Sequence, residues 1–204
     1  DEKGNFIEGY YLVGLLAKSF LIKNRNERVI YDPRLTWNTI DVVERYGGDA
    51  IQCQSGHSFI KKSMRDNDAV YGGEMSAHHY FRDFYYCDSG MIPWLLMLEM
   101  ISEEKMPLSQ MIQKYRERYP VSGEINLKVN NIKTIIDSIK EYYLDDALGV
   151  DETDGVGMEF EKWRFNLRAS NTEPLIRLNV ESNSNESLMN EKTRELVDRI
   201  NNLD

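Results

Sequence analysis

The sequence predicts an α/β fold, a parallel or mixed sheet with helices on both faces, followed by a small α+β domain. Over roughly the first hundred residues, short apolar runs alternate with stretches of helical periodicity, which is typical of a parallel sheet with helices packed on it. The pattern changes at residues 119–123, a linker-like segment. Several strands in a row then precede a last helix, which is typical of an α+β domain. We therefore expect one domain at 1–119 and a second at 120–204.

The first domain is expected to begin with a helix at 7–20, and Asn5 followed by Glu8 resembles its cap. Two glycines after residue 46 stop a second helix, and Pro93 stands where the first turn of a helix tolerates proline. The other expected elements are strands at 28–31, 50–53 and 69–71 and helices at 37–46, 58–64, 94–101 and 108–119.

The second domain is expected to contain more strands than helices. Asp154 and Gly155 form a turn signal between two short apolar segments, and polar loops separate the segments that follow. The expected strands lie at 124–129, 149–150, 156–160, 163–167 and 175–180, and the expected helices at 132–144 and 186–200.

Composition excludes some classes of function. The chain has 34 acidic and 25 basic side chains, a formal net charge of −9, which opposes binding to nucleic acid or to anionic membranes. No apolar run approaches the ~18 residues that a membrane span needs, and no leader-like segment is present. Cys53 and Cys87 show no metal-ligand spacing. We expect a reduced, cytoplasmic chain with neither nucleic acid nor membrane as partner.

Polar side chains follow three of the strands expected in the first domain. Such sheets bind ligands beyond the carboxyl ends of their strands, so a ligand is expected on that side. Glycines let a backbone approach a ligand closely, and a carboxylate beside a hydroxyl can hold the vicinal hydroxyls of a sugar. The polar groups are Asp32 and Arg34, Ser55 and His57, and Glu74, Ser76 and His78.

Simpler roles stay open for several of these residues. His57 near a helix start is compatible with a structural role, and Arg34 with a surface charge. Ser76 near His78 lacks the nucleophile elbow and oxyanion hole of a hydrolase. His78 and His79 are neighbours on an expected extended chain, where side chains point opposite ways, so the two are not expected to share a metal ion.

A second polar cluster lies between two strands of the second domain. It combines guanidinium groups, two hydroxyls and an amide, all donors that suit a phosphate dianion. A solvated hairpin loop in which Ser, Asn and Thr satisfy only turn geometry is the alternative. The candidate phosphate-binding residues are Arg168, Ser170, Asn171, Thr172 and Arg177.

Taken together, these segments resemble the phosphohexomutase superfamily of phosphoglucomutases and phosphomannomutases. Residues 73–78 (GEMSAH) look like its sugar-binding loop, G-E-M-S-G-H, with Ala77 in place of the usual glycine. Residues 168–174 (RASNTEP) look like its phosphate loop, R-x-S-N-T-x-P, and residues 55–61 (SGHSFIK) match its G-H-S-x-I-K element. The resemblance runs along essentially the whole chain and is strongest to bacterial phosphomannomutases.

The resemblance implies an enzyme of four domains, of which this chain looks like the third and fourth. In that family a serine in the first domain carries the transferred phosphoryl group, and a D-G-D-x-D-R loop in the second binds Mg²⁺. Neither motif occurs in these residues. The resemblance therefore implies a C-terminal fragment, inactive by itself, whose partners are the missing N-terminal domains. Mg²⁺ and a hexose 1,6-bisphosphate activator are implied for the whole enzyme, with no metal ligand in this fragment.

The implied reaction interconverts mannose 6-phosphate and mannose 1-phosphate through a phosphoserine and a bisphosphate intermediate. The resemblance implies catalytic roles for His57 and Arg34 and sugar binding by Glu74, Ser76 and His78. The loop at 168–174 would hold the phosphate that is not reacting. Two alternatives stay open: a phosphoglucomutase or dual-specificity mutase, because gluco and manno substrates differ only at the C2 hydroxyl, and a non-catalytic sugar-phosphate-binding module.

Overall fold

The structure, a computed structural model, describes residues 1–170 and 173–204. The chain divides into two compact units, Asp1–Arg116 and Glu117–Asp204. Each unit contains one five-stranded sheet, and each is described by itself.

The first unit is built on a mixed sheet. Its strands are β1 (Arg28–Tyr31), β2 (Asp49–Gln52), β3 (Tyr71–Gly73), β4 (His79–Phe81) and β5 (Cys87–Asp88), in the order β2-β1-β3-β4-β5. β1 pairs in parallel with β2 and β3, whereas β3-β4 and β4-β5 are antiparallel. The expectation of a parallel or mixed sheet is therefore confirmed. β1 has the expected bounds and β2 is shifted by one residue, whereas β3 begins at Tyr71, two residues later than expected.

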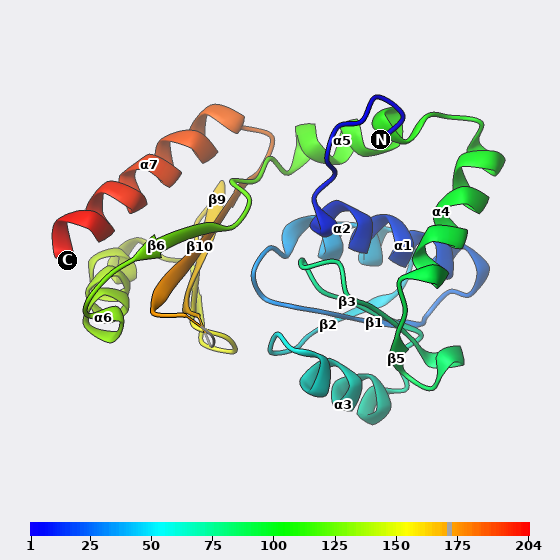
Figure 1. Ribbon diagram of the computed structural model, residues 1–204, viewed down its shortest axis with the longest axis horizontal. Helices are drawn as coiled ribbons and strands as arrows, with labels where there is room; N and C mark the ends of the chain where they lie inside the picture. Colours follow the sequence, from blue (N-terminus) through cyan, green and yellow to red (C-terminus); the bar gives the residue numbers. More distant parts are fainter. Residues whose placement is uncertain (171–172) are drawn as a thin grey trace. The chain divides into compact units, whose positions relative to one another are not determined.

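Helices cover both faces of this sheet, as expected. α1 (Gly9–Lys23) and α2 (Trp37–Arg45) lie on one face and α3 (His57–Asn67) on the other (Figure 1). Val29 packs in the core cluster that contains α1 residues, and its neighbour Ile30 packs in the cluster that contains α3 residues, because successive strand side chains point to opposite faces. α4 (Met91–Glu104), a short 3-10 turn, η1 (Arg82–Phe84), and α5 (Leu108–Arg118), whose last two residues belong to the second unit, complete the helices here.

One local expectation in this unit is wrong. Asn5 does not cap α1: its side chain donates to Asp1 Oδ2 at 3.1 Å, and Glu8 occupies the N-cap position without a side-chain capping bond. The Asn5 backbone N–H, which the Glu8 side chain would accept in a capping box, instead donates to Asp1 Oδ1 at 2.8 Å.

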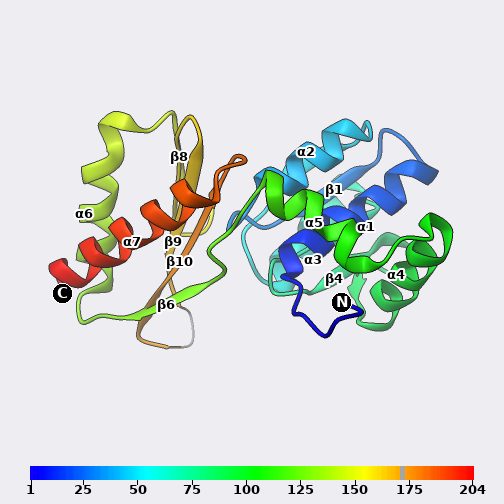
Figure 2. The same cartoon turned by 90° about the horizontal axis from the view of Figure 1, so that it is seen from above.

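The second unit is an antiparallel sheet with both of its long helices on one face. The strands are β6 (Ile125–Lys128), β7 (Gly149–Asp151), β8 (Val156–Glu159), β9 (Trp163–Ala169) and β10 (Leu175–Ser182), in the order β6-β10-β9-β8-β7. α6 (Ile132–Tyr143), extended by the 3-10 turn η2 (Leu144–Asp146), and α7 (Glu186–Leu203) lie on the same side of the sheet (Figure 2). The α+β expectation is confirmed.

Alternation along β9 and β10 gives this sheet two different faces. Phe165, Leu167, Leu178 and Val180 face the core with residues of α6 and α7. The other face carries polar side chains that pair directly across the two strands: Arg164 with Glu181, Asn166 with Asn179, and Arg168 with Arg177.

Candidate functional site

Residues after β1 and β3 meet at one end of the first sheet. β1 and β3 are parallel neighbours, so the chain leaves both strands at the same edge. Arg34 Nη2 lies 3.5 Å from Glu74 Oε2 and 3.3 Å from Ser76 Oγ. Three of the residues predicted from the sequence are thus brought together in space.

Asp32 organises this group. Its carboxylate accepts hydrogen bonds from the Arg34 backbone N–H (3.0 Å), from Arg34 Nε (3.0 Å) and Nη2 (2.7 Å), and from the Met75 backbone N–H (2.6 Å). Asp32 is 2% exposed and Arg34 4%; a buried ion pair of this kind is stable only when its remaining hydrogen-bonding groups are satisfied. The Asp32 carboxylate therefore ties the guanidinium to the loop that carries Glu74 and Ser76.

Glu74 is held from two further directions. The Tyr80 hydroxyl donates to Oε1 at 2.6 Å, and the Gly56 backbone N–H donates to Oε2 at 3.1 Å. Burial, followed by this bond to Glu74, raises the pKa of Tyr80, so the phenol remains a donor. An ionised carboxylate can accept about four hydrogen bonds, so Glu74 keeps acceptor capacity for a ligand.

The loop between β3 and β4 is a tight reverse turn. The Ala77 backbone N–H donates to the Glu74 carbonyl, and the Glu74 N–H donates to the His78 carbonyl, both at 2.9 Å. Ala77 has φ +64°, a conformation that glycine adopts without steric cost. Ser76, Ala77 and His78 are exposed at the tip. The turn presents these side chains to solvent while its base is anchored through Glu74.

The three histidines have different environments. His57 is the first residue of α3 and is exposed. His78 is exposed, with Nδ1 3.9 Å from Asp88 Oδ2. His79 is buried, and its Nδ1 shares a hydrogen bond with the Tyr71 hydroxyl at 2.7 Å. Burial lowers the pKa of His79 to about 4, so this imidazole is neutral near pH 7.

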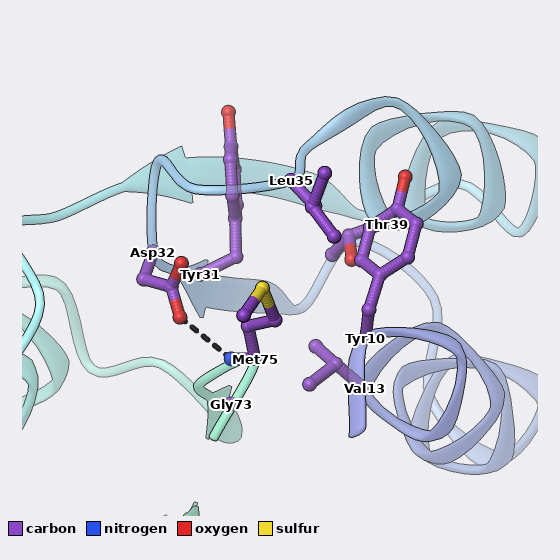
Figure 3. A pocket seen from close by; sticks show the side chains of 8 residues that line it. All are labelled: Tyr10, Val13, Tyr31, Asp32, Leu35, Thr39, Gly73 and Met75. Carbon is purple, nitrogen blue, oxygen red and sulfur yellow. Dashed lines mark hydrogen bonds between the residues drawn. The ribbon is translucent and has the colours of Figure 1, made fainter. Parts of the chain in front are cut away.

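A small hollow lies beside the Asp32 network (Figure 3). Tyr10 and Val13 come from α1, and the Asp32 carboxylate and the Met75 backbone close the opposite side. Its lining also includes Tyr31, Leu35, Thr39 and Gly73. The α1 N-terminus packs closely here, since a Cβ on Gly9 would lie 2.5 Å from the Met75 carbonyl oxygen.

In the second unit, two predicted arginines lie together on the polar face of the sheet. Arg168 in β9 and Arg177 in β10 are directly opposite in register. Glu124, just before β6, accepts from Arg168 Nη2 at 3.3 Å through Oε2 and from Arg177 Nη1 at 3.0 Å through Oε1. Asp154 Oδ2 lies 4.0 Å from Arg168 Nη1.

The remaining residues of the predicted phosphate loop are only partly described. The Ser170 backbone N–H donates to the Leu175 carbonyl at 2.9 Å, which continues the β9-β10 pairing past Ala169. Asn171 and Thr172 lie outside the described residues.

The sequence placed Asp32 on the ligand side but did not indicate that it anchors Arg34. It also did not indicate Tyr80 as the anchor of Glu74, or Glu124 and Asp154 as partners of the arginines. Polar and apolar residues alternate along β9 (WRFNLRA), and this pattern predicts a polar face on the second sheet, opposite its core. The partners themselves come from distant segments, for which the sequence offers no local signal.

Within residues 1–170 and 173–204, there is no group of three or more His, Cys, Asp or Glu side chains suited to a metal ion. In the same part of the chain, no helix is long and apolar enough to cross a membrane.

Two family models cover most of the chain. "Phosphoglucomutase/phosphomannomutase, alpha/beta/alpha domain III" matches residues 8–119, and "Phosphoglucomutase/phosphomannomutase, C-terminal domain" matches residues 124–197. The chain therefore belongs to the phosphoglucomutase/phosphomannomutase family.

Similar proteins agree with that membership. The chain is 56% identical to a phosphomannomutase of Vibrio cholerae over 205 residues, and 54% identical to one of Escherichia coli K12 over 201 residues. It spans 44% of the length of each of these relatives and 100% and 98% of its own length. A crystal structure of a phosphoglucomutase/phosphomannomutase family protein from Burkholderia thailandensis superposes with a TM-score of 0.80 at 27% identity, covering 97% of this chain and 43% of that one.

Proposed function

We propose that this chain is the sugar- and phosphate-recognising part of a phosphomannomutase, which interconverts mannose 6-phosphate and mannose 1-phosphate. The observation that carries the proposal is the loop at 74–78, whose Glu74 and Ser76 side chains meet the buried Arg34–Asp32 pair at the carboxyl ends of parallel strands. The Vibrio cholerae and Escherichia coli K12 relatives, 56% and 54% identical to this chain, carry the name phosphomannomutase. In this proposal the domains at 1–119 and 120–204 are the sugar-binding and phosphate-binding domains.

Sugar recognition would depend on the buried Glu74 carboxylate at the base of the hairpin and on the exposed side chains at its tip. Glu74 would accept from a pair of ring hydroxyls, and Ser76 and His78 would add hydrogen bonds from the exposed turn. A mutase must bind its sugar in two opposite orientations, so it needs contacts to hydroxyls that occupy similar positions after the turnover. The rigid anchoring of Glu74 by Tyr80 and Gly56 suits such positioning, which supplies much of the rate enhancement in phosphoryl transfer.

Charge stabilisation near the reacting phosphoryl group would come from Arg34, with His57 moving a proton on an oxygen. Arg34 is already oriented by two bonds to Asp32, so little reorganisation is needed when a charge develops. The phosphate that is not reacting would be held by the second unit, through Arg168, Ser170, Asn171, Thr172 and Arg177.

Mg²⁺ and a hexose 1,6-bisphosphate activator belong to the proposed whole enzyme. The described residues of this chain offer no cluster of metal ligands, so no step is assigned to a metal here. We further propose that the donor serine and the metal loop belong to N-terminal domains of the same protein, consistent with the 44% coverage of the relatives. The chain would have no nucleic acid or membrane partner and would act in the cytoplasm.

Binding to the 204-residue chain tests the sugar site. Ser76→Ala removes an exposed hydroxyl and is expected to weaken mannose 6-phosphate binding about fivefold, the worth of a neutral hydrogen bond. Calorimetric titration measures this, and inorganic phosphate serves as the control ligand because it lacks ring hydroxyls. Equal loss for both ligands, or no loss, would contradict the assignment of Ser76 to the sugar.

Mannose 1-phosphate turnover by the chain alone would contradict the placing of the donor serine in other domains. Glucose phosphates titrated in parallel distinguish a phosphomannomutase from a phosphoglucomutase or a dual-specificity enzyme. Tight binding of mannose 6-phosphate to this chain, together with no mutase activity of the longer protein, would favour a non-catalytic binding module.

A further inference from the structure

Glu124 lies between the two arginines that face each other across β9 and β10. Its two carboxylate oxygens are divided between them, Oε2 toward Arg168 Nη2 and Oε1 toward Arg177 Nη1, at 3.3 and 3.0 Å. The Arg168 side chain is 8% exposed, and those of Arg177 and Glu124 are 24% and 20% exposed. A single carboxylate therefore bridges two guanidinium groups in a partly buried place.

The arginine pair requires an anion. Like charges directly opposite on neighbouring strands repel, and low surrounding polarity strengthens that repulsion. The other carboxylates close to the pair are more distant, Asp154 at 4.0 Å from Arg168 and Glu173 at 3.9 Å from Arg177. Both Nε atoms are buried without a hydrogen-bond partner among residues 1–170 and 173–204. Of these three carboxylates, Glu124 is thus the one nearest to the arginines.

A carboxylate and a phosphoryl group bind arginine in the same way. Each offers oxygen atoms that accept the parallel N–H bonds of a guanidinium fork. A phosphoryl dianion placed between Arg168 and Arg177 would replace both bonds of Glu124. It would also repel the Glu124 carboxylate if that side chain stayed in place, so the two anions cannot share the position.

We propose that Glu124 is an internal competitor of phosphate: its carboxylate occupies the anion position between Arg168 and Arg177 and lowers the affinity of this place for the phosphoryl group of a hexose phosphate. The inference rests on the proposed phosphate-binding function of the second unit. When no ligand is bound, the Glu124 carboxylate neutralises both arginines. When phosphate is bound, the same carboxylate lowers its affinity, which favours release of product.

Glu124→Gln tests the proposal, because the amide keeps the size of the side chain and one acceptor oxygen but removes the charge. The 204-residue chain is titrated with inorganic phosphate at constant ionic strength and pH. Glu124→Gln is expected to bind phosphate about tenfold more tightly than the unsubstituted chain, the effect of removing one nearby like charge in a partly buried place. A purely structural role for Glu124 predicts weaker binding, because the arginines would lose their alignment.

Glu161→Gln is the matched control. Glu161 is exposed in the same unit. It precedes Trp163, and the strand from Trp163 to Arg168 spans about 17 Å, so Glu161 lies far from the arginine pair. This variant makes the same change in net charge and is expected to leave the phosphate Kd unchanged. If it tightened binding as much as Glu124→Gln, the gain would reflect overall charge and the proposal would be wrong.

Thermal unfolding covers the case in which Glu124→Gln is unstable. The proposal requires that phosphate can take the place of the carboxylate, so added phosphate must raise the Tm of Glu124→Gln more than that of the unsubstituted chain. A variant that stays unfolded in phosphate, or gains no more than the unsubstituted chain, overturns the proposal.

Two results separate the competitor role of Glu124 from the proposed phosphate-binding function of the second unit. If the unsubstituted chain binds phosphate and Arg168→Ala abolishes this binding, but Glu124→Gln brings no gain, the competitor role is wrong and the proposed function stands. If neither the unsubstituted chain nor Glu124→Gln binds phosphate or mannose 6-phosphate, both proposals are wrong.

Discussion

At the scale of single residues, burial gives two adjacent histidines, which look equivalent in the sequence, different properties. His78 and His79 are adjacent, yet the first is exposed at the tip of a turn and the second is buried in β4 beside Tyr71. The extended chain sends consecutive side chains to opposite sides. One imidazole is therefore available to solvent and ligand, while the other is part of the core.

The depressed pKa of His79 predicts a pH-dependent stability. In the unfolded chain this imidazole titrates near 6.5, and in the folded chain near 4, so the unfolded state binds more protons between these values. Stability is then complete above about pH 6.5 and falls as the pH drops toward 4. The expected loss from this group is about 3 kcal/mol.

Urea unfolding at pH 7.5 and pH 4.5 measures the effect. His79→Gln does not titrate in this range. Its free energy of unfolding should therefore fall less between pH 7.5 and pH 4.5 than that of the unsubstituted chain, by an amount approaching about 3 kcal/mol. His78→Gln, at an exposed position, should keep the full dependence. Identical pH dependence for His79→Gln and the unsubstituted chain would contradict the assignment.

At the scale of elements, the turn between β7 and β8 is coupled to the phosphate side of the second sheet. Gly155 has φ +78°, and a Cβ at this position would lie 2.5 Å from both the Leu167 carbonyl oxygen and Arg168 Cβ. The turn thus packs against the backbone of β9 at the arginine. No L side chain fits there without moving that strand.

Gly155→Ala is expected to lower the free energy of unfolding by about 2 kcal/mol or more, since it combines a left-handed backbone with a steric overlap. It should also weaken phosphate binding, because Arg168 must shift. Gly149→Ala, at an exposed position with no atom near the added methyl group, should change stability by less than about 0.5 kcal/mol. Chemical denaturation of both variants gives the comparison, and equal effects would contradict it.

At the scale of the whole molecule, the second unit has a hydrophobic core of its own. A cluster of buried residues that includes Ile139, Phe165, Leu178 and Leu196 lies entirely within Glu117–Asp204. It joins both helices to one face of the sheet. A chain segment with a continuous core of this kind can fold independently.

Residues 117–204 produced alone are therefore expected to fold and to unfold in one cooperative transition. Circular dichroism during a urea titration measures this. Phe165→Ala in the same fragment should cost about 3 kcal/mol or more, because it leaves a cavity in the core. A fragment without a cooperative transition would mean that this core needs the rest of the chain.

Much of the fold could be predicted because its signals are local. The strands β1, β6, β9 and β10 and the helices of both units appear in the sequence as apolar periodicity between turn residues. β4 and β5 have three and two residues, too few for an alternating pattern. β3 and β7 are also three residues long, but apolar residues beside glycines mark them in the sequence. β4 forms by pairing with β3, and β5 forms by pairing with β4.

The sequence by itself determined the fold class, the positions of most elements and the two motifs that belong to the phosphoglucomutase/phosphomannomutase family. Each of these features depends on residues that lie close together in the sequence, so a short segment is enough to recognise it. Only the tertiary structure decided which groups act on the motif residues: Asp32 and Tyr80 at Arg34 and Glu74, and Glu124 at the arginine pair. Those contacts depend on strand order and register, and Glu124 reaches Arg168 from 44 positions earlier in the chain. Such pairings are set by the burial of whole faces, for which a short stretch of sequence carries no signal.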